Sequence, residues 1–510
     1  MSSPFLKLVL DRIDFVRILL QSFANTPIAR PRTSPLQPRS TAVKSRNPVI
    51  FSALVAALGG LLFGFDTAVI SGTTEALQRV FSLDNFSLGF AVASALIGTI
   101  VGAFTAGKPA EVFGRRRVLF VLAVLYFISA AGSSMAPTLA LFVAFRFVGG
   151  LAVGGASVVS PLYIAEIAPA HLRGRLVALN QLNVVTGILL AFLSNFLISQ
   201  HADPASAWRW MLGVQVLPSA LFFVLLYFIP ESPRWLVKKG RVAEARAILE
   251  RTEAGGVEHE LEEIAASVTA EVGHHEAQLF QRRYARPIFL ACTVAMLNQL
   301  SGINALMYYA PRIFRSAGAA ADDALLQSVA VGGTNLLFTA LALFIIDRFG
   351  RRPLLAAGGI GAAVSLALTA AGFYRGGTPG HLVLIGLLGF IAFHAIGQGA
   401  VIWVFISEIF PNTVREKGQA LGSFTHWFMA ALVSWTFPVV AQASGGHAFA
   451  LFATMMLIQF LFAWRIMPET KGLSLEELQH RLGADPAQPA GVQAPRSVLA
   501  AGKIPEAAHR

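Results

Sequence analysis

One acidic residue lies deep inside an uncharged stretch of this sequence. Asp66 stands in GGLLFGFDTAVISG at 59–72, and the basic residue at a comparable depth is Arg146, in AFRFVGGLAVGG. A carboxylate surrounded by apolar residues is costly to keep charged, and its affinity for protons is easily changed by its neighbours. We therefore expect Asp66 to take up and release a proton, with Arg146 as its partner. The alternative is a static ion pair that only joins two helices.

A second group of residues combines amides with aromatic rings and carries no fixed charge. NQLSGINALMYYAP at 298–311 holds Asn298, Gln299 and Asn304. Amides donate and accept hydrogen bonds, as sugar hydroxyls require, and indole rings offer flat apolar faces to the CH groups of a pyranose. The pattern favours a neutral polyhydroxylated ligand, although a single amide in such a helix is as often a contact between helices. The other members are Gln181, Asn183, Asn335, His394, Gln398, Trp403, His426 and Trp427.

The spacing of Gln299 and Asn304 predicts an interrupted helix. Five residues at about 100° each turn the two side chains about 140° apart on a regular helix. Gly302 offers a weak point between them, and Pro311 offers another. We expect a break that brings the two amides together, and an outer helical segment bearing Tyr308 that swings as a gate. A kink without gating is the alternative.

Charged residues gather in short motifs between the apolar stretches. GKPAEVFGRRR at 107–117 and DRFGRRP at 347–353 each hold an acid followed by arginines near helix ends. With further glutamates, they are expected to form cytoplasmic ion-pair clasps that close in one state and open in another. The alternative is static surface pairs worth about 0 to 1 kcal/mol. The residues assigned to this gating are Glu111, Arg115, Glu166, Arg173, Glu231, Asp347, Arg351, Glu408 and Arg415, with Glu469 beside them.

The composition shows which elements must position these residues. The chain has 510 residues, of which 55% are hydrophobic and 13% are charged, whereas soluble domains have about 25% charged residues. This excludes a soluble globular enzyme and predicts an all-α membrane protein, because about 20 apolar residues form one helical span. Twelve transmembrane helices are expected at 49–72, 86–107, 118–136, 138–162, 176–199, 208–229, 287–314, 324–346, 353–374, 381–407, 418–441 and 446–467.

An internal repeat divides these helices into two halves of six. YIAEIAPAHLRG at 163–174 resembles FISEIFPNTVRE at 405–416, and VFGRRR at 112–117 resembles RFGRRP at 348–353. Parallel repeats of this kind are typical of alternating-access carriers with a site at the middle of the membrane. The predicted parts are a basic N-terminal arm at 1–48, an N-terminal half at 49–229, a cytoplasmic helical linker at 230–286, a C-terminal half at 287–467 and a cytoplasmic tail at 468–510.

The basic residues indicate how the chain lies in the membrane. The net charge is +12, and 34 of the 40 Lys and Arg residues fall in the arm, the tail and the loops of one side. By the positive-inside rule, both termini are then cytoplasmic. This distribution makes a lipid bilayer the expected partner and gives no reason to expect nucleic acid.

The arm and the linker carry weaker signals. Apolar residues from Phe5 to Leu20 form one helical stripe, which is compatible with an interfacial helix. The Arg, Ser and Pro-rich stretch after it is a transit-type segment, a disordered linker or over-extended coding sequence. Residues 241–251 and 258–270 have helical spacing and predict two short helices in the linker.

Several chemistries have no support in this sequence. Cys292 is the single cysteine, so neither an internal disulfide nor a cysteine-ligated metal site is expected. GxSxG and HExxH motifs are missing from the sequence. We therefore expect no enzyme activity, no metal and no cofactor.

Together these motifs closely resemble the sugar porter family of the major facilitator superfamily. The resemblance runs from about 50 to 480 and includes GFDTAVISG, PLYIAEIAP, PESPRWL at 230–236, QLSGINALMYYAP, DRFGRRP and PETKG at 468–472. It implies the major facilitator fold and a proton-linked or facilitative monosaccharide carrier in the plasma membrane, such as a bacterial inner membrane, acting as a monomer. It also implies a proton role for Asp66 with Arg146, and sugar-binding roles for Gln181, Asn298, Gln299, Asn304, Asn335, Trp403 and Trp427.

The sequence departs from the family pattern at several of these places. Asn298 stands where the family usually has Gln, and Ala400 stands where it usually has Pro. His426 replaces a Gln or Asn beside the tryptophan, and Gln215 replaces a Glu that xylose and glucose relatives often have. These changes leave the particular sugar open.

Asp66 itself separates two kinds of relative, because passive facilitators typically have Asn at its position. The resemblance therefore favours import of a monosaccharide with protons over passive facilitation. A polyol porter, for example for inositol, stays open beside these two. A non-transporting sugar sensor on the same fold is the remaining alternative.

Overall fold

Helices make up the described part of the chain. The computed structural model describes residues 47–169, 172–252, 256–272, 278–375, 380–473 and 475–482, and no strand occurs among them. Twelve helical segments within these ranges are long and apolar enough to cross a membrane. The prediction of an all-α protein with twelve spans is therefore confirmed. The stripe from Phe5 to Leu20 lies outside the described residues.

The first six spans form the N-terminal half. Its elements are α2 (Asn47–Val69), η1 (Ile70–Gly72), α3 (Thr74–Val80), α4 (Asn85–Thr105), α5 (Gly107–Phe113), α6 (Arg115–Met135), α7 (Leu139–Ile167), α8 (Arg173–His201), α9 (Ala207–Gly213), α10 (Val216–Leu225) and η2 (Leu226–Phe228).

The linker and the C-terminal half follow. The linker holds α11 (Pro233–Lys238), α12 (Val242–Thr252), α13 (Val257–Val272) and η3 (Arg282–Tyr284). The second half holds α14 (Ala285–Gln299), α15 (Ile303–Ser316), α16 (Ala321–Phe349), α17 (Arg351–Arg375), α18 (Gly380–His394), the π-helix η4 (Ala395–Gly399), α19 (Ala400–Glu408), α20 (Arg415–Ala443) and α21 (Gly445–Arg465). A short helix, α22 (Leu475–Leu482), comes after it.

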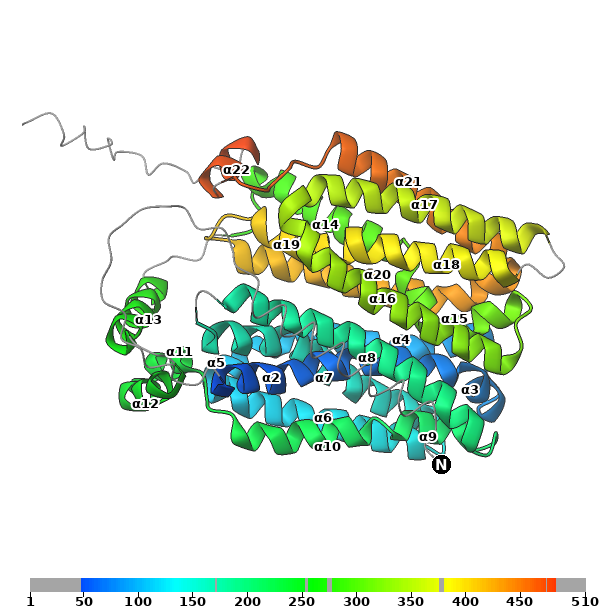
Figure 1. The fold of residues 1–510 in the computed structure, drawn as a ribbon, viewed down its shortest axis with the longest axis horizontal. Helices are drawn as coiled ribbons and strands as arrows, with labels where there is room; N and C mark the ends of the chain where they lie inside the picture. The colour runs from blue at the N-terminus through cyan, green and yellow to red at the C-terminus, as the bar shows by residue number, and fades with distance from the viewer. Residues whose placement is uncertain are drawn as a thin grey trace, which may run out of the picture. The chain divides into compact units, whose positions relative to one another are not determined.

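The long helices of both halves run side by side between two ends of the bundle (Figure 1). At one end lie α11, α12 and α13, together with α5 and α22; we call this the linker end. At the other lie α3 and α9; we call this the opposite end. The two helices predicted in the linker are present as α12 and α13.

Glycines let helices of the same half approach closely. A Cβ atom added at Gly64 of α2 would lie 1.8 Å from the Val184 carbonyl oxygen of α8, and one added at Gly187 would lie 2.0 Å from the Leu61 oxygen. Backbone contact of this kind is how membrane helices gain packing energy without a hydrophobic driving force. Any side chain at these two positions would push α2 and α8 apart.

The two halves meet along two pairs of helices. Phe86 and Phe90 of α4 pack on Trp435 of α20, with ring centroids 5.3 Å and 5.1 Å apart. On the other side, a Cβ atom added at Gly332 of α16 would lie 3.0 Å from the Leu189 Cα atom of α8. The site described below lies between these two contacts.

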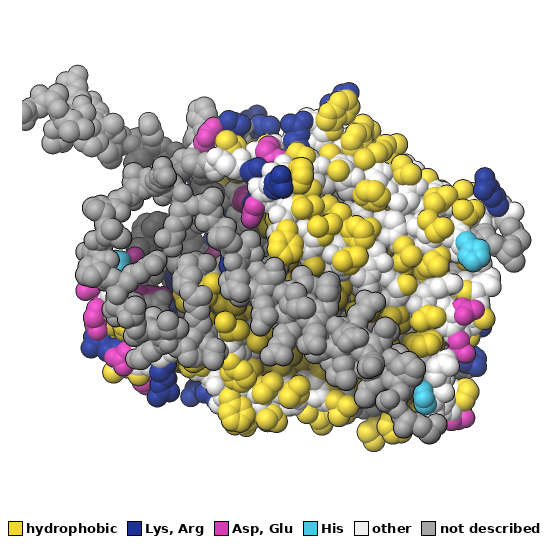
Figure 2. All heavy atoms as spheres, viewed as in Figure 1, with side chains coloured by type: hydrophobic (Ala, Val, Ile, Leu, Met, Phe, Trp, Pro, Cys, Tyr) yellow, Lys and Arg dark blue, Asp and Glu magenta, His cyan; other side chains and the backbone are white. Residues whose placement is uncertain are grey.

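The outer surface of the bundle is apolar along the helices and charged at the ends. Figure 2 shows hydrophobic side chains over the length of the helices, with Lys, Arg, Asp and Glu gathered mainly toward the ends. Large apolar residues such as Phe228, Leu217 and Val364 are more than 60% exposed. Such a surface is stable against lipid tails, which supports the reading of these helices as membrane spans.

The charged motifs lie farther inside the helices than predicted. The fourth span was expected to end at 162 and the eighth at 346, yet α7 continues to Ile167 and α16 continues to Phe349. Glu166 and Asp347 are therefore helical rather than in loops. In these extensions Arg115 pairs with Glu166 and Arg351 pairs with Asp347. Helices α11 and α22 and the π-helix η4 are also additions to the predicted elements.

Candidate functional site

A buried ion pair joins the first and fourth spans. The Arg146 Nη1 atom of α7 lies 2.7 Å from the Asp66 Oδ1 atom of α2, and Arg146 Nη2 donates to the Asp66 carbonyl oxygen at 3.4 Å. Asp66 is 2% exposed and Arg146 is 1% exposed. The structure thus places the two residues as the sequence predicted. An isolated buried charge would be unfavourable, and in this pair each charge compensates the other.

Hydroxyl groups surround this ion pair. The Tyr308 side chain of α15 interacts electrostatically with both Asp66 and Arg146 and also contacts Thr67. The Tyr126 hydroxyl of α6 interacts electrostatically with Asp66. Asp66 is therefore within reach of polar groups from both halves of the molecule.

A polar cavity of about 140 Å³ lies between the two halves. Its walls include all eight residues predicted to bind the substrate, together with Tyr308 and His394. The predicted members are Gln181, Asn298, Gln299, Asn304, Asn335, Trp403, His426 and Trp427. Asn183 and Gln398, which the sequence grouped with them, are outside the lining, and Gln398 instead bonds to Gln459 of α21.

The predicted break in the seventh span brings its amides together. Helix α14 ends at Gln299 and α15 begins at Ile303, after Gly302 with φ of +82°. This left-handed conformation favours glycine. Asn304 Nδ2 then donates to Gln299 Oε1 at 2.7 Å, although a regular helix would turn the two side chains apart. Within α15, Tyr309 has φ of −129° and ψ of 16°, so a second irregularity lies beside Tyr308.

The amides and rings of the cavity hold one another in place. Gln299 Nε2 donates to Asn298 Oδ1 at 2.8 Å and lies 3.1 Å and 3.2 Å from the two ring nitrogens of His426. The His426 ring packs 4.8 Å from both the Trp403 and the Trp427 ring centroids. The cavity therefore offers donors, acceptors and flat apolar faces with no fixed charge.

Some lining residues were missed at the sequence level. Phe63, Ile303, Met307 and Ile402 line the cavity but are ordinary apolar residues of membrane helices, so no sequence signal marks them. Thr67 had a signal, since it directly follows Asp66 and is a polar residue in the same apolar stretch.

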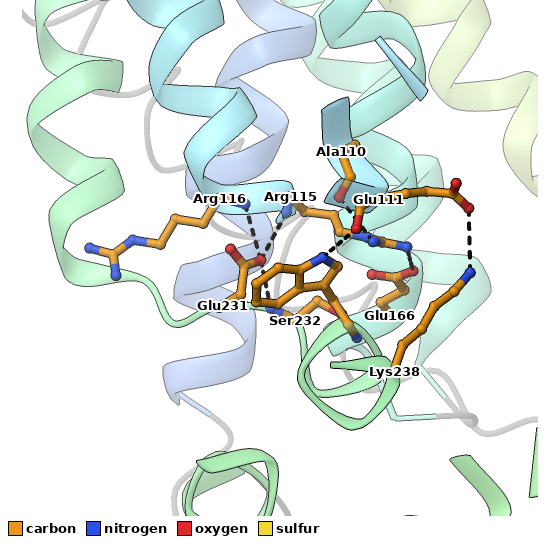
Figure 3. Close-up of polar contacts among 9 residues, drawn as sticks. Ala110, Glu111, Arg115, Arg116, Glu166, Glu231, Ser232 and Lys238 are labelled. Atoms are coloured by element: carbon orange, nitrogen blue, oxygen red, sulfur yellow. Dashed lines mark hydrogen bonds and ion pairs between the residues drawn. The ribbon is translucent and has the colours of Figure 1, made fainter. Parts of the chain in front are cut away.

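The linker end carries one clasp in each half. In the first, Arg115 Nη2 lies 2.8 Å from Glu166 Oε1, and Glu231 accepts hydrogen bonds from the backbone N–H groups of Arg115, Arg116 and Ser232 (Figure 3). Carboxylates bound in this way stiffen helix ends, because they satisfy N–H groups that have no partner within the helix.

The second clasp repeats the first in the C-terminal half. Arg351 Nη2 lies 2.9 Å from Glu408 Oε1, and its Nη1 lies 3.4 Å from Asp347 Oδ1. Glu469 accepts hydrogen bonds from the backbone N–H groups of Arg351 and Thr470. Burial raises the pKa of Glu469. Hydrogen bonds from four backbone N–H groups together lower the pKa by more than burial raises it, so it falls below its ordinary value of 4.5. These donors are Lys471, Arg351, Arg352 and Thr470.

Three of the residues assigned to gating have other contacts than expected. Glu111 pairs with Lys238 of the linker at 3.4 Å rather than with an arginine of its own motif (Figure 3). Arg173 and Arg415 donate to the carbonyl oxygens of Ala165 and Phe410. Sequence spacing alone placed these side chains near the acids, whereas helix packing directs them to helix ends.

The opposite end carries contacts that the sequence analysis did not single out. Arg312 of α15 donates to Gln78 Oε1 of α3 and to Asn85 Oδ1 of α4, both at 2.9 Å. Arg315 pairs with Glu75 of α3. These bonds tie the C-terminal half to the N-terminal half. The arginines are visible in the sequence, but their partners lie more than 200 residues away.

Asn85 adds one more tie at this end. Its Nδ2 atom donates to Gln442 Oε1 of α20 at 2.6 Å, while its Oδ1 atom accepts from Arg312. We call the set of Glu75, Gln78, Asn85, Arg312, Arg315 and Gln442 the cross-half network.

Comparison with known proteins agrees with this geometry. The family model described as "Sugar (and other) transporter" matches residues 52–482. The D-xylose-proton symporter of Escherichia coli (strain K12) is 40% identical over 474 residues, which cover 84% of this chain and 95% of that protein. The glucose transport protein of Synechocystis sp. is 38% identical over 470 residues, covering 87% and 100%.

A solved structure is similar over the same region. The inward open conformation of the xylose transporter from E. coli aligns with a TM-score of 0.76 and 39% sequence identity. The alignment covers 85% of this chain and 99% of that one.

Proposed function

This chain belongs to the family of sugar transporters, and on that premise we propose that it imports a monosaccharide together with protons by alternating access. It is a twelve-span membrane protein of the major facilitator fold. The observation that carries the proposal is the buried Asp66–Arg146 pair beside an uncharged polar cavity that both halves line. Thr67 and Tyr308 line that cavity, and Tyr308 also interacts with the pair.

Proton coupling follows from the dependence of the two charges on each other. When Asp66 accepts a proton, its carboxyl becomes neutral and the attraction to Arg146 is lost. The α2–α7 contact is then held by weaker hydrogen bonds, so the two helices are freer to move. In this scheme protonation of Asp66 shifts the equilibrium between the two states of the carrier. The sugar shifts the same equilibrium by binding to the neighbouring cavity wall.

Sugar recognition rests on the amides and rings of the cavity. Gln299 and Asn304 offer donors and acceptors to hydroxyl groups, and Trp403 and Trp427 offer faces to the apolar side of the ring. Asn335, Gln181 and Asn298 complete the polar wall. A neutral ligand fits this set because a charged one would find no opposite charge there.

The present structure corresponds to the state that is closed at the opposite end. The cross-half network ties the halves there. Each described ion pair at the linker end instead lies within one half, within the linker, within α22, or between the linker and the N-terminal half. Because 34 of the 40 Lys and Arg residues fall in the arm, the tail and the loops expected on one side of the membrane, we assign the linker end and both termini to the cytoplasmic side. The state is then inward-facing, in a bacterial inner membrane.

One assay tests transport and coupling together. The chain is expressed in cells that lack their own sugar porters, and external pH is followed in weak buffer after addition of xylose, glucose, galactose, arabinose, fructose or inositol. We expect at least one sugar to raise the pH. Asp66→Asn should abolish this rise and uphill uptake while leaving sugar exchange, because its amide cannot carry a proton.

The outcomes separate the alternatives. Sugar accumulation retained by Asp66→Asn would contradict the coupling. Exchange of a labelled sugar without any pH change in the wild type would identify a passive facilitator, and a response to inositol alone would identify a polyol porter. Binding of a sugar without flux would identify a sensor.

A further inference from the structure

Helices α6 and α7 pack closely and in regular antiparallel register. A Cβ atom added at Gly155 would lie 2.5 Å from Leu122, one at Gly149 would lie 2.3 Å from Ser129 Oγ, and one at Gly132 would lie 2.3 Å from Phe145. Moving along α6 toward its end at Met135 thus means moving along α7 toward its beginning. The same register places Arg146 between the levels of Ser129 and Ser133.

Three buried polar atoms along this seam have no hydrogen-bond partner among the described residues. They are the Tyr126 hydroxyl, Arg146 Nε and Ser133 Oγ. Tyr126 is 0% exposed, and the other two residues are each 1% exposed. The neighbouring Ser134 differs, since its Oγ donates to the Ala131 carbonyl oxygen at 2.8 Å. Leaving a buried polar group without a partner costs about 1 to 3 kcal/mol, so such groups are normally satisfied.

By this register Ser133 lies on the opposite-end side of Asp66, whereas Tyr126 lies on its linker-end side. Tyr126, Ser129 and Ser133 follow one another at spacings of three and four residues, which places them on one face of α6. A Cβ atom added at Gly149 would contact Ser129 Oγ and would also lie 3.6 Å from Asp66 Oδ1. Ser133 lies two residues before Met135, where α6 ends at the opposite end. Ser129 and Ser133 therefore lie between the ion pair and the end of α6 at the opposite end.

We infer that internal waters bind the unpartnered atoms of Arg146 and Ser133, and that with the hydroxyls of Ser129 and Ser133 they carry the proton between Asp66 and the aqueous phase at the opposite end. Internal waters typically bind to two to four polar groups, and this seam offers them in sequence. The sugar cavity lies elsewhere, on the side of α2 that bears Phe63 and Thr67. Proton and sugar thus follow separate routes that meet at α2 and at Tyr308.

The transfer is balanced at every step. A proton from the aqueous phase binds a water or hydroxyl at Ser133, which releases one of its own protons to the next group, and the last group protonates the Asp66 carboxylate. Only Asp66 changes its protonation state. The groups facing it are Arg146 of α7, Tyr126 of α6 and Tyr308 of α15. Because Arg146 Nη1 holds Asp66 Oδ1 in this state, the ion pair interrupts the path until it opens.

This inference rests on the proposed function, since it assumes that Asp66 carries the coupled proton. The test compares two substitutions of equal size, Ser133→Thr and Ser133→Val, which differ in a hydroxyl and a methyl group. Each protein is reconstituted into liposomes that contain a pH-sensitive dye. The initial rate of proton movement driven by a D-xylose gradient, or by a gradient of the sugar that gives the largest pH response in cells, is measured beside sugar counterflow.

We expect the valine variant to move protons about tenfold more slowly than the threonine variant, with counterflow of the two within a factor of two. Ser134→Ala is the control, because its hydroxyl is bound to the helix, and it should match the wild type.

The possible failures are distinguishable. Equal proton rates for the valine and threonine variants would overturn the path and leave the proposed function intact. Counterflow that falls in parallel with proton movement would show that the hydroxyls only support packing. Wild-type protein that exchanges sugar without moving protons would instead overturn the proposed function.

Discussion

The two ends of this molecule are held together in different ways. At the opposite end, Arg312 of the C-terminal half binds Gln78 and Asn85 of the N-terminal half. At the linker end, Arg115 binds Glu166 within one half and Arg351 binds Glu408 within the other. The difference shows where the halves separate, because bonds inside a half can persist through a rigid-body movement whereas bonds between halves must break.

The internal repeat explains part of this contrast. Each half carries its own copy of the clasp, so both halves are stiffened in the same way at the linker end. The contacts at the opposite end are not duplicated: Glu75 and Gln78 lie on α3, whereas the matching connection in the C-terminal half, residues 317–320, holds no helix. The closed end therefore depends on a feature of one half only.

The largest effect is expected from Arg115→Ala. Glu166, whose side chain is 6% exposed, would lose its ion-pair partner, and breaking a buried pair on one side typically costs about 3 to 5 kcal/mol. The thermal midpoint of the purified protein should fall, without a change in the distance between the halves at the opposite end. Arg351→Ala is the matched comparison and should cost less, because its pair with Glu408 is more exposed. Equal losses would mean that burial does not set the strength of the clasps.

Arg312→Ala should act on the equilibrium between states rather than on stability. It removes two hydrogen bonds between halves from a charged donor, each worth about 1.5 to 3 kcal/mol. The population open at the opposite end should therefore rise at least about a hundredfold. Distances between spin labels on α4 and α20 would report this shift. An unchanged distance distribution would show that the helix contacts around Trp435 keep this end closed without Arg312.

The hydrogen bonds of Glu469 in the second clasp make a smaller, pH-dependent contribution to stability. The pKa of Glu469 lies below its ordinary value of 4.5, so its stabilising effect is complete above about pH 4.5 and is lost as the pH falls through the lowered pKa. The thermal midpoint should therefore decrease in this acidic range. Glu469→Gln should lower the midpoint at neutral pH and reduce its dependence on acid. A wild-type pH profile in this variant would assign the acid sensitivity to other carboxylates.

The smallest effect is expected from Arg315→Ala. Its pair with Glu75 also joins the halves, but the two side chains are 45% and 37% exposed. Exposed pairs contribute about 0 to 1 kcal/mol, and salt weakens them further. The shift between states should stay below about fivefold and disappear at high salt. A shift as large as that of Arg312→Ala would mean that exposure does not separate the two arginines.

Much of the site was predictable from the sequence because membranes penalise polar residues strongly. Asp66 and Arg146 are conspicuous because each charge at the centre of a bilayer costs about 2.5 to 3.5 kcal/mol. Pairing the two charges reduces this penalty for both. The break at Gly302 was predictable because Gln299 and Asn304 cannot meet on a regular helix. The twelve spans follow from uncharged length alone.

Other features depend on which helices become neighbours. Glu111 contacts Lys238 because α11 folds back onto α5, which spacing within one motif does not reveal. Arg312 and Asn85 are 227 residues apart, and the unpartnered Tyr126 hydroxyl is recognisable only once α6 lies against α7. The sequence by itself thus determined which charged and polar residues are unfavourable in the membrane unless they have a partner. This energetic penalty depends only on the residue type and on its place within an apolar stretch. Only the tertiary structure decided which partner each of these residues contacts, because contacts between helices depend on packing over the whole bundle.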